Sequence, residues 1–412
     1  MNRTETNQDL IIAGGGLAGL VQAVLLGSSG WRIMVLERGD GLSALSDPRS
    51  LALSESTRSI LDEIGAWDSL RPECAEVTRI DVSQRGAFGS TRLHAEDEQL
   101  PALGYVVPAG ILAKILRETV DDLPNCTFMT QTSVEEVEPQ GAGIALKIQQ
   151  DDTPQTVCGR LLIAADGARS ALRDALGLHA EEVDYDQSAV VAEVEMDRAA
   201  EGWAYERFTR TGPLALLPHP SGRRALVWAL SRKTAREART WPDSKFCREL
   251  QQALGSRAGQ VINAEPRNFY DLTFRRVQQR IGTRCVLIGD AAYSFHPVAA
   301  QGFNLVVRDA AWLAQVLGDA KQKEADPGAP QLLEEYAQVR DTDARRVAGF
   351  TDLLARGFVM QNPLIRGLRA ASLFALEGMP QCRTRLVRFG MGADLPRADL
   401  ALKAGRKGSA HA

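Results

Sequence analysis

One stretch, from Asp9 to Arg38, constrains the fold of this chain more than any other. Its apolar runs at residues 10–13 and 33–36 are short and unbroken, as expected of buried strands, and a helix-compatible segment at residues 17–28 lies between them. A glycine pattern, G-x-G-x-x-G, joins the first run to that segment. This order predicts a β-α-β unit with a phosphate-binding turn, and therefore an α/β fold that binds a dinucleotide.

The three glycines of this pattern have separate tasks. Gly14 permits the tight turn, Gly16 lets a pyrophosphate approach the backbone because it has no Cβ, and Gly19 lets helix and strand pack closely. The helix then begins at Leu17 and Ala18, where unpaired N–H groups and the positive end of the helix dipole face the phosphates.

An acidic residue at the end of the second strand supports this interpretation. Glu37 ends the second strand, about twenty residues after the first glycine, and is well placed to bind ribose hydroxyls. Its charge disfavours the 2′-phosphate of NADP. The glycine pattern alone is weak in a chain with 36 glycines, but the flanking strands and this acid strengthen it. Together they favour FAD or NAD, and Arg38 follows directly after the acid.

Composition sets wider bounds. A chain of 412 residues has room for two or more domains. A net charge of −4 gives no reason to expect nucleic acid as a partner. Six scattered cysteines without a C-x-x-C pair, and five histidines without ligand spacing, indicate neither a disulfide framework nor a metal site. The first residues lack an apolar signal core and no long apolar run follows, so we expect a cytoplasmic protein that does not span a membrane.

Two later stretches again place a turn after a buried strand. The strands are expected at residues 161–165 and 284–288, and a helix begins at Gly302 after the second turn. The turns are Asp166-Gly167 and Gly289-Asp290. Ligands of open α/β sheets bind outside the carboxyl ends of the strands, which is where these turns fall. A plain turn is the alternative for the first of them.

Arg49 stands in a loop rich in Gly, Ser, Asp and Pro. The loop leads into a helix predicted at residues 54–65, with Ser54 as its N-cap. An arginine in a loop is ordinarily solvated. Because this loop lies near the first β-α-β unit, contact with a cofactor phosphate is the second possibility.

A change of pattern predicts how the domains are arranged. Residues 183 to 275 alternate polar and apolar side chains, which is typical of an antiparallel sheet inserted into the α/β chain. The dinucleotide-binding, Rossmann-like domain is therefore discontinuous. We assign residues 1–75, 108–180 and 276–345 to that domain, 76–107 and 181–275 to a substrate (sheet) domain, and 346–412 to C-terminal helices and a tail.

The C-terminal helical segment is basic. Between Arg345 and Gly390 there are eight arginines and two acids, a net charge of +6. Two interpretations remain open. The segment is a helical cap whose arginines pair with the acidic remainder, or it is an amphipathic surface for anionic lipid heads. The second implies peripheral contact with the inner membrane, through apolar residues that include Phe358, Leu364, Leu368 and Phe374.

Three motifs form one larger pattern. They are GGGLAG at residues 14–19, ADGARS at 165–170 and GDAAYSFHPVAAQGFN at 289–304. In this order and spacing they resemble the single-component FAD-dependent aromatic hydroxylases with the para-hydroxybenzoate hydroxylase fold. Within that family, DPRSLALSESTRSILDEIGAWDSL, IDVSQRGAFGSTRL, LGYVV and ERFTRTGPLALLP are similar to the ubiquinone-biosynthesis hydroxylases, and most similar to those that act on 2-polyprenyl-6-methoxyphenol.

The resemblance implies a set of residues around FAD. Those expected to bind the cofactor are Gly14, Gly16, Leu17, Ala18, Gly19, Glu37, Arg38, Arg49, Asp166, Gly167, Gly289, Asp290, Pro297, Gly302, Phe303 and Asn304. In this assignment Asp290 holds a ribityl hydroxyl, and Asp166 and Gly167 serve both FAD and NAD(P)H. The N–H groups of Gly302, Phe303 and Asn304, at a helix start, would stabilise negative charge on reduced flavin.

The resemblance also implies the activity. NAD(P)H would reduce FAD, and the reduced flavin would activate O₂ to hydroxylate a polyprenylated phenol, para to its hydroxyl in the most similar subfamily. The expected partners are that phenol, O₂, NAD(P)H and other proteins of ubiquinone biosynthesis. No catalytic side chain is identified: Tyr293 is undecided, and His296 is a candidate by position alone, for which a loop-structuring role is favoured.

Other functions stay open at this point. A hydroxylase of a soluble aromatic acid would need a charged clamp, for which Arg207 or Arg223 is available. A flavin reductase or a flavin-binding structural member of a membrane-associated complex would share the FAD motifs. Two departures bear on the last alternative, because Ala300 and Val306 stand where similar sequences have glycine.

Overall fold

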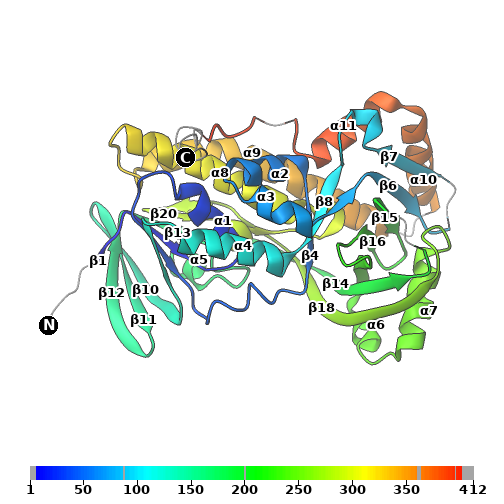
Figure 1. Cartoon of the computed structure of the whole chain (residues 1–412), viewed down its shortest axis with the longest axis horizontal. Coiled ribbons are helices and arrows are strands. Elements are labelled where there is room, and N and C mark those ends of the chain that lie inside the picture. Colours follow the sequence, from blue (N-terminus) through cyan, green and yellow to red (C-terminus); the bar gives the residue numbers. More distant parts are fainter. Residues whose placement is uncertain (1–5, 87–88, 199–200, 360–362, 395, 401–412) are drawn as a thin grey trace, which may run out of the picture.

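The computed structural model describes residues 6–86, 89–198, 201–359, 363–394 and 396–400. A six-stranded sheet lies at the centre of one end of the molecule (Figure 1). Its order is β19-β20-β13-β2-β3-β9, and every neighbouring pair is parallel except β19 with β20. The strands are β2 (Leu10–Ala13), β3 (Ile33–Leu36), β9 (Cys126–Met129), β13 (Leu161–Ala164), β19 (Ile281–Gly282) and β20 (Cys285–Leu287).

Helices cover one face of this sheet. Strand residues such as Leu10 and Ile163 pack there against the helices in one large apolar cluster. These helices are α1 (Leu17–Leu26), α2 (Glu55–Glu63), α3 (Trp67–Leu70), α4 (Ala109–Asp121) and α8 (Gln301–Gln322), with α9 (Pro330–Val359) packed along α8. The strands have apolar residues on both faces, as a parallel sheet covered on both sides requires.

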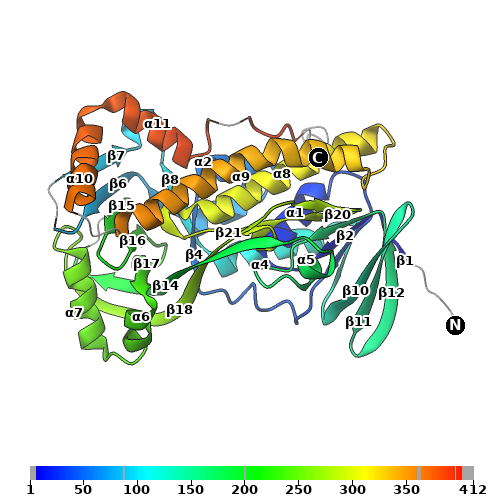
Figure 2. The same cartoon turned by 180° about the vertical axis from the view of Figure 1, so that it is seen from behind.

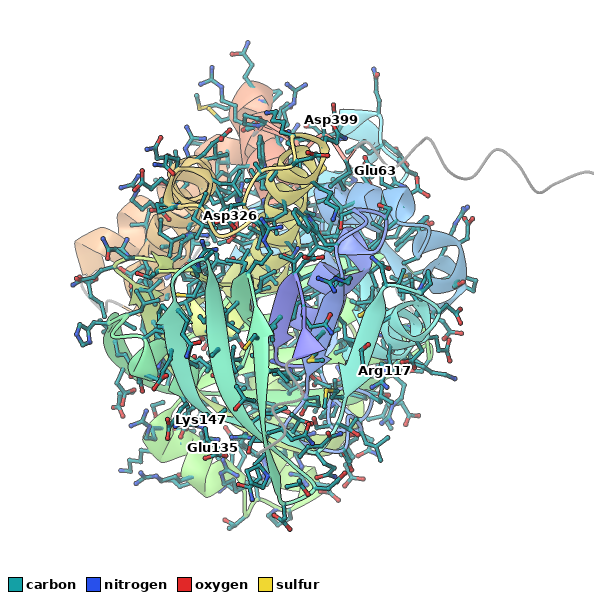
Figure 3. The ribbon with its side chains drawn as sticks, turned by 90° about the vertical axis from the view of Figure 1, so that its left-hand side faces the viewer. Glu63, Arg117, Glu135, Lys147, Asp326 and Asp399 are labelled. Carbon is teal, nitrogen blue, oxygen red and sulfur yellow. The ribbon has the colours of Figure 1, made fainter. Side chains whose placement is uncertain are left out.

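A second, smaller sheet covers the opposite face. Ile11 and Leu162 pack there against Leu146 and Val157. The order of this sheet is β1-β12-β11-β10, from β1 (Thr6–Asn7), β10 (Thr132–Gln140), β11 (Gly143–Gln150) and β12 (Thr153–Gly159). Figure 3 views the molecule from this end, with Lys147 on the small sheet and Arg117 on α4.

An eight-stranded sheet makes up most of the other end of the molecule (Figure 1). Its order is β21-β18-β14-β17-β16-β15-β6-β7, and only β15 and β6 run parallel. The strands are β6 (Arg79–Gln84), β7 (Ser90–His94), β14 (Ala180–Met196), β15 (Trp203–Phe208), β16 (Pro213–Pro218), β17 (Arg224–Ser231), β18 (Val261–Val277) and β21 (Tyr293–Ser294). One face is covered by α6 (Arg232–Ala238) and α7 (Asp243–Leu254), which bury Leu216 and Trp228.

Two further elements join these parts. A three-stranded sheet of β4 (Ser50–Leu53), β8 (Gly104–Pro108) and β5 (Ala75–Val77) lies between the large sheets. The last helices, α10 (Pro363–Gly378) and α11 (Pro380–Gly390), lie beside β6 and β7 (Figure 2). The α/β fold with an antiparallel sheet and C-terminal helices is therefore confirmed, while the exact domain boundaries stay a prediction.

Candidate functional site

The three motifs meet at one edge of the parallel sheet. Strands β2, β13 and β20 are neighbours, and their carboxyl ends point the same way. The N–H of Ala165 donates to the carbonyl of Ala13 at 2.7 Å, and the N–H of Ile288 donates to the carbonyl of Ala164 at 2.9 Å. The turns that follow these strands therefore lie side by side, as expected of a ligand site in an open α/β sheet.

The glycines of the first turn differ in what surrounds them. A Cβ on Gly14, whose φ is +118°, would lie 2.3 Å from the carbonyl oxygen of Ala165, and one on Gly19 would lie 1.9 Å from that of Gly14. A Cβ on Gly16 would meet no atom of the described residues within 4 Å. Gly14 and Gly19 are thus required by close backbone packing, whereas the space beside Gly16 is open and fits a pyrophosphate.

Glu37 lies beside this turn. Its carboxylate accepts hydrogen bonds from the N–H groups of Gly15 and Gly39, both at 2.7 Å. Each carboxylate oxygen retains a lone pair for a sugar hydroxyl, since an ionised carboxylate offers about four acceptor sites. Arg38 is exposed next to it, while Leu17 and Ala18 are half-buried at the start of α1. This arrangement fits the predicted ribose contact.

Asp166 first of all shapes its own turn. Its carboxylate accepts from the hydroxyl of Ser170 at 2.6 Å and from the N–H of Leu172 at 3.2 Å, at the start of α5 (Ala171–Ala175). Gly167 has φ of +84° and open space beside it. The plain-turn interpretation therefore accounts for the carboxylate, and the contacts of Asp166 and Gly167 with FAD or NAD(P)H stay a prediction.

The structure brings Asp290 and Arg49 together, although 241 positions separate the two residues in the sequence. Desolvation by the surrounding protein raises the pKa of the Asp290 carboxyl above its ordinary value. Arg49 and Arg275 partly offset this shift, so both guanidinium groups lie near that carboxyl. Arg49 also pairs with Asp47 at 2.6 Å and stays half-exposed, so its predicted contact with a cofactor phosphate remains open.

The loop before α8 has an unusual backbone. Ala299 and Ala300 have φ of +59° and +50°, in the left-handed region that costs an alanine about 1–2 kcal/mol. Ala300 therefore has the conformation that glycine adopts freely. A Cβ on Gly302 would meet nothing within 4 Å in the described structure, and Phe303 is half-buried beside it. This open first turn of α8 fits the edge of a flavin.

Val306, the second position at which similar sequences have glycine, lies on the inner side of α8. Val306 is buried, and a Cβ on Gly289 would lie 3.9 Å from its Cγ1. The same Cβ would lie 2.7 Å from that of Ala18. Val306 therefore fills space behind the Gly289 turn, and Gly289 is needed because α1 passes close to it.

Asn304 ties the loop to a segment far away in the sequence. Its Nδ2 donates to the carbonyl of Ala52 at 2.9 Å, and its Oδ1 accepts from the N–H of Ser54 at 2.8 Å and the hydroxyl of Thr57 at 2.7 Å. Ser54 is the N-cap of α2, as predicted. The side chain of Asn304 therefore positions the loop, and its backbone N–H remains the group expected to face flavin.

The two undecided side chains have structural partners. His296 is buried; its Nδ1 accepts from the N–H of Val298, so Nε2 carries the proton and donates to Gln187 at 3.2 Å. Burial lowers the pKa of His296 to about 4, which keeps the ring neutral. Tyr293 donates to Asp309 at 2.5 Å within a buried ionic cluster. The favoured loop-structuring role of His296 thus agrees with its contacts, and Pro297 follows it directly, half-buried at the start of the next turn.

Comparisons with known proteins decide the family. A family model described as FAD binding domain matches residues 7–351. The chain belongs to the FAD-dependent monooxygenases. It is 33% identical over 388 residues to ubiquinone hydroxylase UbiL of Rhodospirillum rubrum, covering 93% of this chain and 89% of that protein. It is 27% identical over 394 residues to 3-demethoxyubiquinol 3-hydroxylase of Escherichia coli, covering 94% and 100%.

A solved structure agrees with this family. The p-nitrophenol 4-monooxygenase PnpA of Pseudomonas putida superposes with a TM-score of 0.81, at 19% identity, over 96% of this chain and 100% of that one. At this identity the likeness establishes the fold. The monooxygenase is therefore a flavoprotein enzyme with FAD as cofactor, in a family whose usual electron donor is NAD(P)H. The described residues hold no group of three or more His, Cys, Asp and Glu that could bind a metal ion.

The monooxygenase has a cradle that fits FAD along one path. Gly16 and the start of α1 would hold the pyrophosphate, Glu37 the adenosine ribose and Asp290 the ribityl chain. The first turn of α8, with its unpaired N–H groups, would face the flavin ring. Bound there, FAD supplies the redox chemistry that activates O₂, and the protein holds and orients it.

Sequence reasoning missed two side chains that hold this cradle together. Arg173, buried on α5, donates to the carbonyls of Ala168 and Ala291 at 3.3 and 3.4 Å, and so joins the second motif to the third. Gln301 donates to the carbonyl of Gly390 at 3.1 Å and thus ties the flavin loop to α11. An arginine in the short helix that follows the ADGARS motif was a usable signal for the first, whereas nothing local indicates the second.

Proposed function

We propose that this monooxygenase hydroxylates a polyprenylated phenol of ubiquinone biosynthesis, namely 2-polyprenyl-6-methoxyphenol, with NAD(P)H and O₂. The names of UbiL and of the E. coli 3-demethoxyubiquinol 3-hydroxylase support this pathway, because both proteins align over nearly the whole chain. The ring carbon that receives oxygen is expected to be para to the hydroxyl. The phenol would bind between the eight-stranded sheet and the flavin loop.

The observation that carries the proposal is a cluster of small apolar side chains on one sheet face. On the face opposite α6 and α7, Ala204 and Ala225 pack with Val106 of β8, and Leu217 and Ala52 lie against the same cluster. Ala52 is the residue whose carbonyl Asn304 binds, so this face adjoins the flavin loop. Small apolar side chains leave room for a prenylated ring and offer no charge to a carboxylate.

For the alternative substrate, a soluble aromatic acid, neither candidate arginine is placed to bind the carboxylate. Arg207 donates to the carbonyl of Ala253 at 3.0 Å and to Ser83 at 3.4 Å, which places it on the α7 face of the sheet. Arg223 lies 3.8 Å from Glu193, at the hairpin before β17. With Arg207 turned away from the flavin loop and Arg223 beside an acid, the prenylated phenol is the better supported substrate.

The test compares two phenols on the purified, FAD-loaded enzyme. A short-chain 2-prenyl-6-methoxyphenol should stimulate NAD(P)H oxidation and give a product that is one oxygen heavier by mass spectrometry. 4-Hydroxybenzoate should give no product. The reverse result would reject the prenyl phenol and leave the monooxygenase assignment intact. NAD(P)H oxidation with hydrogen peroxide as the only product from either phenol would count against hydroxylation of both.

Membrane contact is the second part of the proposal. No helix in the described ranges is long and apolar enough to cross a bilayer. On α10, Phe374 is 73% exposed, as expected of a residue that enters a lipid surface. Arg383 of α11 supports the alternative helical-cap interpretation, since it lies 3.7 Å from Asp97. The side chains of Phe358, Leu364 and Leu368 lie outside the described residues.

We expect the enzyme to bind anionic vesicles through this basic segment. Reversing two exposed arginines of α11, Arg385→Glu with Arg388→Glu, should lower binding about tenfold, or about 1.4 kcal/mol. Binding of the parent should fall steeply as salt rises, because exposed charges act within a Debye length. The matched control reverses Lys233 and Arg236 on α6, which changes net charge equally. Equal binding to neutral and anionic vesicles in a sedimentation assay would argue against this contact.

A further inference from the structure

One carboxyl of the eight-stranded sheet is buried without a hydrogen-bond partner for one of its oxygens. Glu206 lies in β15, where it is in register with Val82 of β6 and Ala215 of β16. Its Oε1 is buried and has no hydrogen-bond partner among the described residues. A buried polar atom without a partner costs folding free energy, so a functional reason for it is expected.

The strand pattern shows which face Glu206 occupies. Alternate residues of a strand share a face, so Glu206 lies on the same side as Ala204, about 7 Å further along β15. Ala204 packs with Val106 in the cluster that adjoins Ala52 and the flavin loop. Arg207, the next residue, reaches Ala253 of α7 on the opposite side. Glu206 therefore lies on the sheet face that carries the Ala204 cluster, the face on which the substrate is proposed to bind.

Other elements close off this region. Ile80 of β6 is in register with Ala204 and packs against the cluster that holds Val387 and Met391 at the end of α11. The same end of α11 carries the Gly390 carbonyl that Gln301 binds. The sheet, β8 and the end of α11 thus border the apolar cluster at Ala204, the neighbour of Glu206 on this face of the sheet.

We propose that Glu206 binds the hydroxyl of the phenolic substrate and accepts its proton. The O–H bond breaks, the proton moves to a carboxylate oxygen of Glu206, and the electron pair stays on the phenol oxygen. That negative charge raises the electron density at the ortho and para ring carbons, where oxygen is added. When the hydroxylated ring becomes aromatic again it loses its C–H proton to solvent, and Glu206 returns its proton to the oxygen. The assignment rests on the proposed function.

The electrostatic surroundings suit this role. Desolvation raises the pKa of Glu206 to about 8, which brings it closer to the value of about 10 for a phenol and improves the match for proton transfer. Two ion pairs lie on the neighbouring elements: Glu193 is 3.8 Å from Arg223 at the sheet, and Arg383 of α11 is 3.7 Å from Asp97. His296 in the loop is neutral.

The first experiment is a pH profile of Glu206→Gln, which keeps the shape of the side chain. Because the base form exists above the pKa, kcat/KM of the parent for 2-prenyl-6-methoxyphenol should rise from pH 6 and level off above about pH 8. The variant should be about 100-fold slower at pH 9 and should converge with the parent near pH 6. Its FAD content should match that of the parent. Glu195→Gln, an exposed carboxyl on β14, is the control and should keep the parent profile.

A second measurement separates this proposal from the proposed function. The infrared C=O band of the protonated Glu206 carboxyl should be present in the parent below pH 8, absent in Glu206→Gln, and shifted when the prenyl phenol is added. A shifted band without hydroxylated product would retain the Glu206 contact and reject the reaction. Product formation with an unshifted band, or with a parental pH profile in Glu206→Gln, would overturn the role of Glu206 and retain the reaction.

Discussion

Replacement of Gly16 with valine should give a folded enzyme that no longer retains FAD. A side chain at Gly16 meets no described protein atom within 4 Å, and the φ of −75° suits any residue, so the fold tolerates the change. The branched side chain would instead occupy the place of the pyrophosphate. We expect FAD affinity to fall at least 1,000-fold, or about 4 kcal/mol. Flavin absorbance after gel filtration, together with circular dichroism, measures both outcomes.

Valine substitutions at two other glycines serve as controls for this experiment. Gly318→Val, in the body of α8, also adds a side chain where no described atom lies within 4 Å, and it should leave the protein yellow. Gly19→Val should prevent folding, because its Cβ would lie 1.9 Å from a backbone oxygen. A yellow Gly16→Val protein with parental FAD affinity would show that the cofactor does not pass this turn.

The sequence was sufficient to predict the parts whose signals are local. The β-α-β unit follows from apolar runs, glycine spacing and Glu37, and the N-cap at Ser54 follows from a side chain that bonds three residues ahead, to Thr57. The convergence of the three motifs could also be predicted, because parallel strands bring their carboxyl ends to one edge.

Contacts between distant segments could not be predicted in this way. Asn304 binds Ser54 across 250 positions, and no local pattern indicates that pairing. The small sheet of β10 to β12 is predicted as a hairpin from the sequence, yet it packs against one face of the parallel sheet. The burial of Glu206 could not be predicted, because a carboxyl in an alternating strand ordinarily faces solvent, and only the tertiary structure buries its Oε1.

The buried ionic cluster was also invisible to sequence patterns. Asp309 of α8 is fully buried and accepts from Arg280 at 2.8 Å, from Arg340 at 2.5 Å and from Tyr293 at 2.5 Å. Asp343 of α9 pairs with Arg340 and, at 2.9 Å, with Arg308. The cluster thereby joins α8, whose first turn faces the flavin site, to α9 and to the third motif.

Replacement of Asp309 with alanine should destabilise the enzyme by about 3–5 kcal/mol, because it leaves two buried guanidinium groups short of a partner. Urea unfolding measures this loss, and Asp319→Ala, exposed on the same helix, should stay within about 0.5 kcal/mol of the parent. Burial alone would raise the pKa of Asp309, but Arg340 and Arg280 hold it below its ordinary value of 3.8. The stabilisation is therefore complete at neutral pH and is lost as pH falls below about 4, where parent and variant should converge. A variant as stable as the parent at pH 7 would mean that the cluster contributes no net stability.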